Sequence, residues 1–154
     1  MDTANERAQY LGLWRYQSDG ILFELKIELV DQKINLIESD VGVFYYYMDR
    51  VTLRYKLVKN GVTLHDNLNS VNIEGYIVSY GSKSVNLSMS GRILDYTRNV
   101  AGQYKITRLN TTPPKIIFKL NEFNYKLINP DSFYQGDQPL FSLPLGNIEM
   151  EKVD

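Results

Sequence analysis

The sequence predicts a single all-β domain built from antiparallel strands. Apolar and polar residues alternate with a period of two in several segments, most clearly from Ile21 to Val30, and this pattern is typical of a strand with one buried and one solvated face. Asp19-Gly20 and Asn60-Gly61 favour two-residue hairpin turns, because both central residues of a type I′ turn need a positive φ. No segment shows the period of a long amphipathic helix.

Turn-forming residues separate ten segments in which we expect strands. These segments are residues 10–17, 21–30, 33–38, 43–59, 62–66, 71–79, 84–96, 102–109, 115–121 and 147–153. Residues 43–59 are long for one strand, and we expect a bend near Met48-Asp49. Gly75 and Gly91 stand inside strand-like segments, which indicates a bulge or a bend at each.

Two further segments complete the chain, which we treat as one domain over residues 1–154. Residues 1–8 are expected to form a tail or a short helix. Residues 122–146 combine three prolines with several aromatic residues, and we expect a loop or flap that covers one end of the sheet, with a turn of helix near 131–135. The flap either serves a ligand site or simply covers the core.

Short connections between the expected strands favour up-and-down connectivity. An antiparallel barrel of about 8–10 strands would remove exposed strand edges, so a barrel is the first expectation for the architecture. A β-sandwich is the alternative.

The charge balance argues against nucleic acid as a partner. Lys and Arg number 17, Asp and Glu number 18, and the two signs are interspersed along the chain. No apolar run reaches the roughly 18 residues of a membrane-spanning helix. The polar start suits a mature exported protein whose signal segment was replaced by a methionine, and a cytoplasmic protein is the other interpretation.

Few residues of this chain are suited to catalysis or to metal binding. Cysteine is absent and His65 is the only histidine. Asp66 follows His65 directly, but neighbouring residues of a strand point to opposite faces, so an exposed hairpin histidine is the simpler interpretation. The pairs Glu24/Glu28 and Glu149/Glu151 stand on the polar faces of expected strands, where solvated charge is the expected explanation. We therefore expect a non-enzymatic protein without a cofactor or a metal.

Aromatic residues are the main candidates for ligand contact, because the chain has 12 Tyr and 6 Phe and contains the run Phe44-Tyr45-Tyr46-Tyr47. Tyrosine offers a ring for stacking and a hydroxyl for hydrogen bonding. The simpler explanation is that aromatic residues are good strand formers. The residues that we select as ligand-binding candidates are Tyr45, Tyr47, Tyr55, Phe118, Phe133 and Phe141.

The Gly12-x-Trp14 motif in the first expected strand resembles the signature of lipocalins and fatty-acid-binding proteins. The resemblance implies that Trp14 closes one end of a barrel and that a basic residue from a late strand, Arg108 or Lys119, packs over its ring. The chain also resembles small exported Bacteroidota proteins of unassigned function, through its Gly-x-Trp strand, its Tyr- and Asn-rich meander and an ending like Leu145–Lys152. That resemblance implies export and supplies no catalytic residue.

Two functions follow as hypotheses. In the first, a barrel binds a small apolar or amphipathic ligand that enters under residues 122–146, although large inward side chains such as Phe23 and Met89 reduce the room. In the second, the chain is a structural or protein-interaction domain of the bacterial envelope, or a partner that neutralises an effector. This hypothesis predicts an exposed aromatic patch made from Tyr45, Tyr47, Phe133 and Phe141. The oligomeric state stays open.

Overall fold

The computed structural model describes residues 7–70, 79–80 and 88–153, and it describes no side chains at residues 30–37, 44–50 and 79–80. It contains nine strands and two short 3₁₀ helices in this part of the chain. The elements are η1 (Ala8–Tyr10), β1 (Gly12–Ser18), β2 (Ile21–Ser39), β3 (Gly42–Lys59), β4 (Val62–Asp66), β5 (Ser79–Tyr80), β6 (Ser88–Asp95), β7 (Val100–Leu109), β8 (Lys115–Leu127), η2 (Pro130–Ser132) and β9 (Asn147–Val153).

The nine strands form one antiparallel sheet in the order β4-β3-β2-β1-β9-β8-β7-β6-β5. Each strand pairs with its neighbour in the chain, apart from β4 and β5, and the last strand β9 pairs with the first strand β1. Two meanders are therefore joined through β9. This order confirms the all-β antiparallel class and the up-and-down connectivity.

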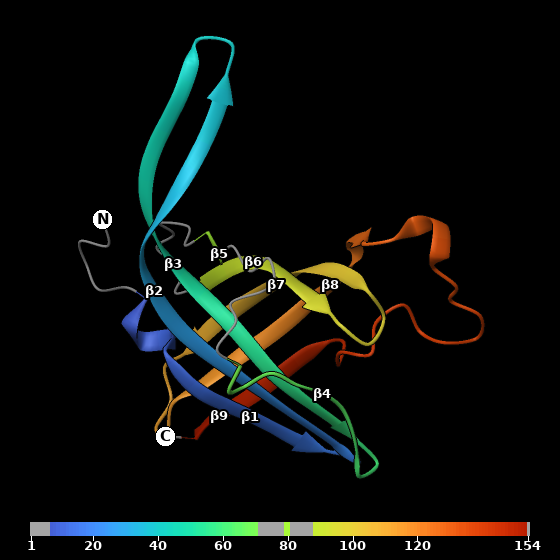
Figure 1. Cartoon of the computed structure of the whole chain (residues 1–154). Coiled ribbons are helices and arrows are strands. Elements are labelled where there is room, and N and C mark those ends of the chain that lie inside the picture. Colours follow the sequence, from blue (N-terminus) through green and yellow to red (C-terminus); the bar gives the residue numbers. More distant parts are fainter. Residues whose placement is uncertain (1–6, 71–78, 81–87, 154) are drawn as a thin grey trace.

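The sheet is not closed into the expected barrel. Strands β4 and β5 stand at the two ends of the order, and the described residues show no pairing between them. Instead the sheet is strongly curved, so that β1–β3 and β6–β9 face each other across one interior (Figure 1). β3 and β5 lie close together near the open side.

The interior is made by alternate residues of the strands, as the period of two predicts. Phe23, Leu25 and Ile27 of β2 are buried, and so are alternate residues of β3, β7 and β8. The other buried apolar strand residues are Trp14, Val51, Leu53, Tyr55, Leu57, Met89, Ile93, Val100, Tyr104, Ile106, Ile116, Phe118, Leu120, Ile148 and Met150.

Both predicted hairpin turns are present. Asp19 and Gly20 have φ of 51° and 77°, and Asn60 and Gly61 have φ of 49° and 79°. Positive φ at both central positions is what a two-residue turn between twisted strands requires. The turns connect the paired residues Ser18↔Ile21 and Lys59↔Val62.

Strands β2 and β3 form a long hairpin that projects from the body of the protein (Figure 1). The two segments expected at 21–30 and 33–38 are one strand. The register shifts between Val30 and Lys33, so that two residues of β2 face Asp49 of β3. This bulge lies at the bend that we expected near Met48-Asp49, and it separates the body from the projecting part of the hairpin.

Several sequence predictions are corrected by the pairing. Gly91 pairs regularly with Tyr104, so β6 has no bulge there. β8 continues to Leu127, so the first residues of the expected 122–146 flap belong to a strand. The helical turn begins at Pro130. The expected bulge at Gly75 and most of the expected strand 71–79 lie outside the described residues. No helix in the described part of the chain is long and apolar enough to cross a membrane.

Candidate functional site

Aromatic rings contact one another in the core, where a ligand was expected. The Phe23 ring lies 5.3 Å from the Phe118 ring and 6.1 Å from the Tyr55 ring, in both cases edge to face. Tyr104 stacks on Phe118 at 6.2 Å. These contacts join the two halves of the sheet through side chains and occupy the space between them.

The four ligand-binding candidates whose side chains are described lie in different surroundings. Tyr55 and Phe118 are core residues that both contact Phe23. Phe141 is buried as well, and it packs edge-on against Tyr125. Phe133 is half-buried in the loop after β8, below the Arg98 guanidinium. Phe141 is therefore not part of an exposed aromatic patch, and the prediction is wrong for this residue. The side chains of Tyr45 and Tyr47 lie outside the described residues, so their place in such a patch stays a prediction.

Trp14 closes one end of the interior. Its side chain is fully buried, and its indole Nε1 donates a hydrogen bond of 2.8 Å to the Tyr10 carbonyl in η1. Arg108 lies over the ring at 5.8 Å and Lys152 lies over it at 5.7 Å. Arg108 is one of the two basic residues that the lipocalin resemblance suggested, whereas Lys119 is exposed on the outer face of β8.

Gly12 is required by this arrangement. Its φ is +123°, a conformation that other residues rarely adopt, and a Cβ there would lie 2.8 Å from Cε of Lys152. The glycine thus allows Lys152 to pass close to the backbone and reach the Trp14 ring. The end of the sheet near Trp14 is a packed structural unit.

Asp95 forms a hydrogen-bond network at the end of the sheet opposite Trp14. Its carboxylate is fully buried and accepts hydrogen bonds from the Ser142 amide, from Ser142 Oγ at 2.6 Å and from the Leu143 amide at 3.0 Å. It also accepts one from the Arg98 amide at 3.1 Å, in the turn between β6 and β7. One side chain therefore holds the buried part of the loop, residues 141–144, against the sheet. This part of the predicted flap covers the core.

A second aromatic cluster lies beside Asp95, around His65. The imidazole stacks on Tyr96 at 4.3 Å and contacts the Tyr55 ring at 4.6 Å. The expected exposed hairpin histidine is therefore wrong. Its Nε2 is buried without a hydrogen-bond partner, and burial lowers the pKa of His65, against an opposing effect of Asp66. The half-buried imidazole packs against both tyrosines as an aromatic ring.

The Tyr55 hydroxyl is tied into the backbone across the interior. It donates a hydrogen bond of 3.0 Å to the Leu94 carbonyl and accepts one of 3.0 Å from the Tyr96 amide. Burial raises the pKa of this hydroxyl. Tyr55 therefore holds β3 to the end of β6, so its role is structural.

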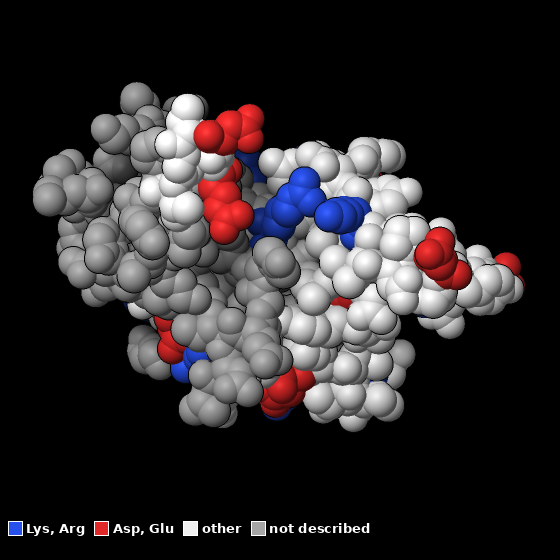
Figure 2. Space-filling view, turned by 45° about the horizontal axis from the view of Figure 1, so that its top comes forward, with Lys and Arg blue, Asp and Glu red and all other residues white. Residues whose placement is uncertain are grey.

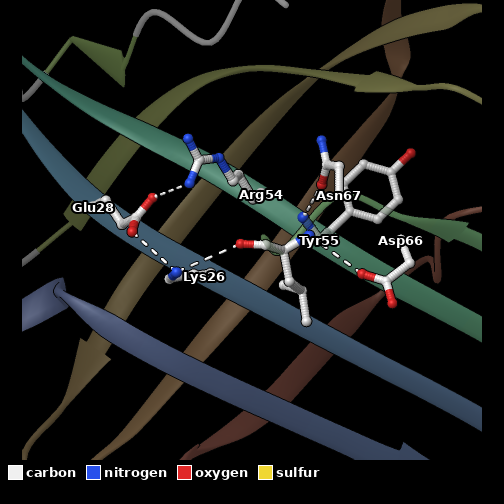
Figure 3. Close-up of polar contacts among 7 residues, drawn as sticks. Lys26, Glu28, Arg54, Tyr55, Asp66 and Asn67 are labelled. Carbon is white, nitrogen blue, oxygen red and sulfur yellow. Dashed lines mark hydrogen bonds and ion pairs between the residues drawn. The ribbon is translucent and has the colours of Figure 1, made fainter. Parts of the chain in front are cut away.

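The outer face of β2–β4 carries a polar network that ties down the chain after β4 (Figure 3). Glu28 forms ion pairs with Arg54 at 2.7 Å and with Lys26 at 3.1 Å. The Tyr55 amide donates to Oδ1 of Asn67 at 2.8 Å, so Asn67 continues the strand edge where β4 ends. Asp66 accepts from the Leu68 amide at 3.2 Å.

The projecting arm, residues 30–50, contrasts with these packed ends. Its two strands pair from Lys33↔Met48 to Ser39↔Gly42, and no other described strand pairs with this part of either strand. The register brings Leu36 opposite Tyr45 and Ile37 opposite Phe44. The paired segments are rich in apolar and aromatic residues in the sequence. Val41 and Val43 at the tip are exposed.

The described residues hold no cluster of three or more His, Asp or Glu side chains suited to a metal ion. Comparisons with family models, with curated proteins and with solved structures gave no match to this chain.

The sequence analysis missed Asp95 and the His65–Tyr96 stack. A signal for Asp95 was present, because the alternation through Met89 and Ile93 directs residue 95 inward, and an inward carboxylate must be hydrogen-bonded. No sequence signal indicates the stack, since it joins β4 to a turn thirty residues further on.

Proposed function

We propose that this protein is a non-enzymatic interaction module, a lipocalin-like up-and-down β scaffold that offers its projecting arm to a protein partner. The observation that carries the proposal is the arm, where the paired segments 33–39 and 42–48 pair with no other strand in the described part of the chain. A two-stranded ribbon is at best marginally stable in water unless something covers it. A partner that covers the apolar arm would supply the missing burial.

The packed interior supports this proposal over a small ligand held inside the sheet. Tyr55 and Phe118 both contact Phe23 in the core, where such a ligand would lie, and Asp95 holds the loop under which it would enter. Strand edges and aromatic side chains are common means of protein recognition. An exported or envelope location belongs to the same proposal, through the resemblance to exported proteins.

Site-specific photo-crosslinking tests the proposal. A photoreactive phenylalanine analogue is placed at position 45 or 47, with Lys126 on the body of the protein as the control position. The competitor is an armless protein, in which Asn-Gly replaces residues 31–49. This dipeptide connects the paired residues Val30 and Arg50 by the turn type present at Asn60-Gly61.

We expect a discrete adduct from the arm in cells that produce the protein, and none from position 126. Excess unmodified protein should suppress this adduct, and excess armless protein should not. Equal suppression by both proteins, or no adduct from either arm position, would show that the arm is not the docking element.

A further inference from the structure

A groove of about 710 Å³ runs over the outer face of β6–β8, away from both packed ends and separate from the arm. The residues that matter for its chemistry are Gln103, Lys105, Lys119, Asn121, Glu122 and Phe123. Two core residues, Tyr104 and Leu120, also line the groove, whereas the six residues named above lie outside the core cluster.

A three-residue bulge in β8 forms one wall of the groove. Asn121 pairs with Gln103 and Tyr125 pairs with Gly102, so the residues Glu122, Phe123 and Asn124 face no partner in β7. Side chains hold the bulge in place: Oδ1 of Asn121 accepts from the Phe123 amide at 3.0 Å, and Nδ2 of Asn124 donates to Gln103 Oε1 at 2.6 Å. As a result, Phe123 is 88% exposed. Ordered bulges are frequent beside binding sites.

Lys105 and Lys119 face each other across β7 and β8 on this outer face. Like charges directly opposite each other in a sheet are destabilising, so an isolated pair of lysines is unfavourable here. Neither lysine forms an ion pair within the described residues. Elsewhere on the outer face, lysines such as Lys26, Lys56 and Lys115 do have carboxylate partners.

On the face seen in Figure 2, several Lys and Arg side chains lie close together near the upper middle, and one group of Asp and Glu side chains lies beside them. In a chain with a net charge of −1, such a cluster creates a local positive field that the total charge conceals.

The polar groups of the groove are mostly donors. The side-chain carbonyls of Asn121 and Gln103 accept hydrogen bonds within the bulge, and the NH₂ groups of the same side chains are donors. Glu122 supplies one carboxylate at the wall, so the two lysines outnumber the acids of the groove. Donors and cations together suit a ligand group that has several acceptor oxygens and a negative charge.

We propose that this groove binds a small ligand that carries an oxyanion group and a ring. The oxyanion, which is a phosphate, a sulfate or a carboxylate, lies between Lys105 and Lys119, and the ring packs against Phe123. Binding removes the repulsion between the two lysines and covers the exposed phenyl ring. This inference is independent of the arm and of its partner.

Titration calorimetry with defined probes tests the site. The probes are 4-nitrophenyl phosphate, 4-nitrophenyl sulfate, 4-nitrobenzoate and inorganic phosphate, with 4-nitrobenzyl alcohol as the neutral compound. We expect saturable binding of at least one aromatic anion at millimolar concentration or below, and weaker binding of inorganic phosphate. The order of the three aromatic anions identifies the oxyanion that the groove prefers.

Variants separate the groove from other cationic surfaces. Lys105→Gln combined with Lys119→Gln should weaken anion binding by at least about ten-fold, because both charged donors are lost. Phe123→Ser should weaken the aromatic anions and leave inorganic phosphate within about two-fold. Lys126→Gln, an exposed position of the same strand outside the groove, should change neither. Circular dichroism confirms that each variant is folded, since all four positions are exposed.

Three results would overturn the proposal. They are the absence of saturable binding for every anion, binding that the double lysine variant retains, and equal binding of the neutral alcohol. Tighter binding of a single-stranded oligonucleotide, with a steep dependence on salt, would assign the lysines to nucleic acid instead.

Discussion

Single side chains hold the ends of this sheet together, and Asp95 is the clearest case. A buried carboxylate is stable only when its oxygens are hydrogen-bonded, and here three backbone amides and a hydroxyl supply the donors. The donors come from the β6–β7 turn and from a loop more than forty residues away. Asp95 therefore links two segments that lie far apart in the sequence.

Replacing Asp95 by alanine should destabilise the protein by at least about 2 kcal/mol, since the buried amides of Ser142 and Leu143 lose their acceptor. Urea unfolding measures this loss. Limited proteolysis should also show faster cleavage within residues 128–146. The exposed Asp131→Ala serves as the control and should stay within about 0.5 kcal/mol of the parent. Equal stability of the two variants would contradict the role of Asp95.

His65 makes stability depend on pH in a predictable direction. Burial lowers its pKa in the folded state below the ordinary 6.5, while Asp66 and Asp95 act in the opposite direction. The unfolded chain therefore takes up a proton first. The favourable contribution of the neutral imidazole is complete above about pH 6.5 and is lost as the pH falls through the folded-state pKa.

The variant His65→Phe keeps a ring against Tyr55 and Tyr96 but cannot titrate. The free energy of unfolding of the parent, relative to this variant, should fall between about pH 7.5 and about pH 5.5. Urea titrations of both proteins at the two pH values measure the difference, so other titrating groups cancel. A difference that does not change with pH would show that His65 has the same pKa in both states.

At the level of strands and turns, the sequence predicted those features that depend only on residues close together in the chain. The turns at Asp19-Gly20 and Asn60-Gly61 follow from the φ values that these residues tolerate, and the strands 62–66 and 147–153 have the predicted bounds. Alternation also gave the buried face of β2. These features need no knowledge of the partner strand.

Features that depend on register between strands were not predictable in this way. The bulge at 122–124 exists because β8 has three residues more than β7 between two pairs, and only the pairing reveals that difference. The opposition of Lys105 and Lys119 has the same origin. Alternation alone also cannot show whether a strand has neighbours, so the sequence did not reveal that residues 33–48 project from the sheet.

The β8 bulge itself can be tested by deletion. Removing Glu122, Phe123 and Asn124 connects Asn121 to Tyr125, whose partners Gln103 and Gly102 are already adjacent in β7. The strand keeps its alternation, because Asn121 faces outward and Tyr125 contacts the buried Phe141. We expect the unfolding free energy to stay within about 1 kcal/mol of the parent, because no core side chain is lost.

This deletion removes a wall of the groove, so anion binding should decrease by at least about ten-fold while the urea midpoint is nearly unchanged. A strongly destabilised deletion variant would show that the bulge serves folding. A stable variant with unchanged binding would show that the bulge does not shape the groove.

At the scale of the whole molecule, β9 connects two meanders that share one interior. β1–β4 form one meander, β5–β8 form the other, and β9 pairs with both β1 and β8. Its residues Ile148 and Met150 also enter the core. The strand β9 therefore lies in the middle of the sheet order, and we expect cooperative folding to depend on it.

A chain that ends at Leu145 should lose its single cooperative unfolding transition, since β1 and β8 lose a shared partner and the core loses two large side chains. Calorimetry and near-ultraviolet circular dichroism measure this loss.

A circular permutant provides the matched control. Because Leu13 pairs with Val153, a linker of about six residues can join residue 154 to residue 8, with new ends between Val41 and Gly42 at the arm tip. The permutant keeps every described strand pairing and should unfold cooperatively. Cooperative unfolding of the truncated chain would instead show that each meander folds without β9.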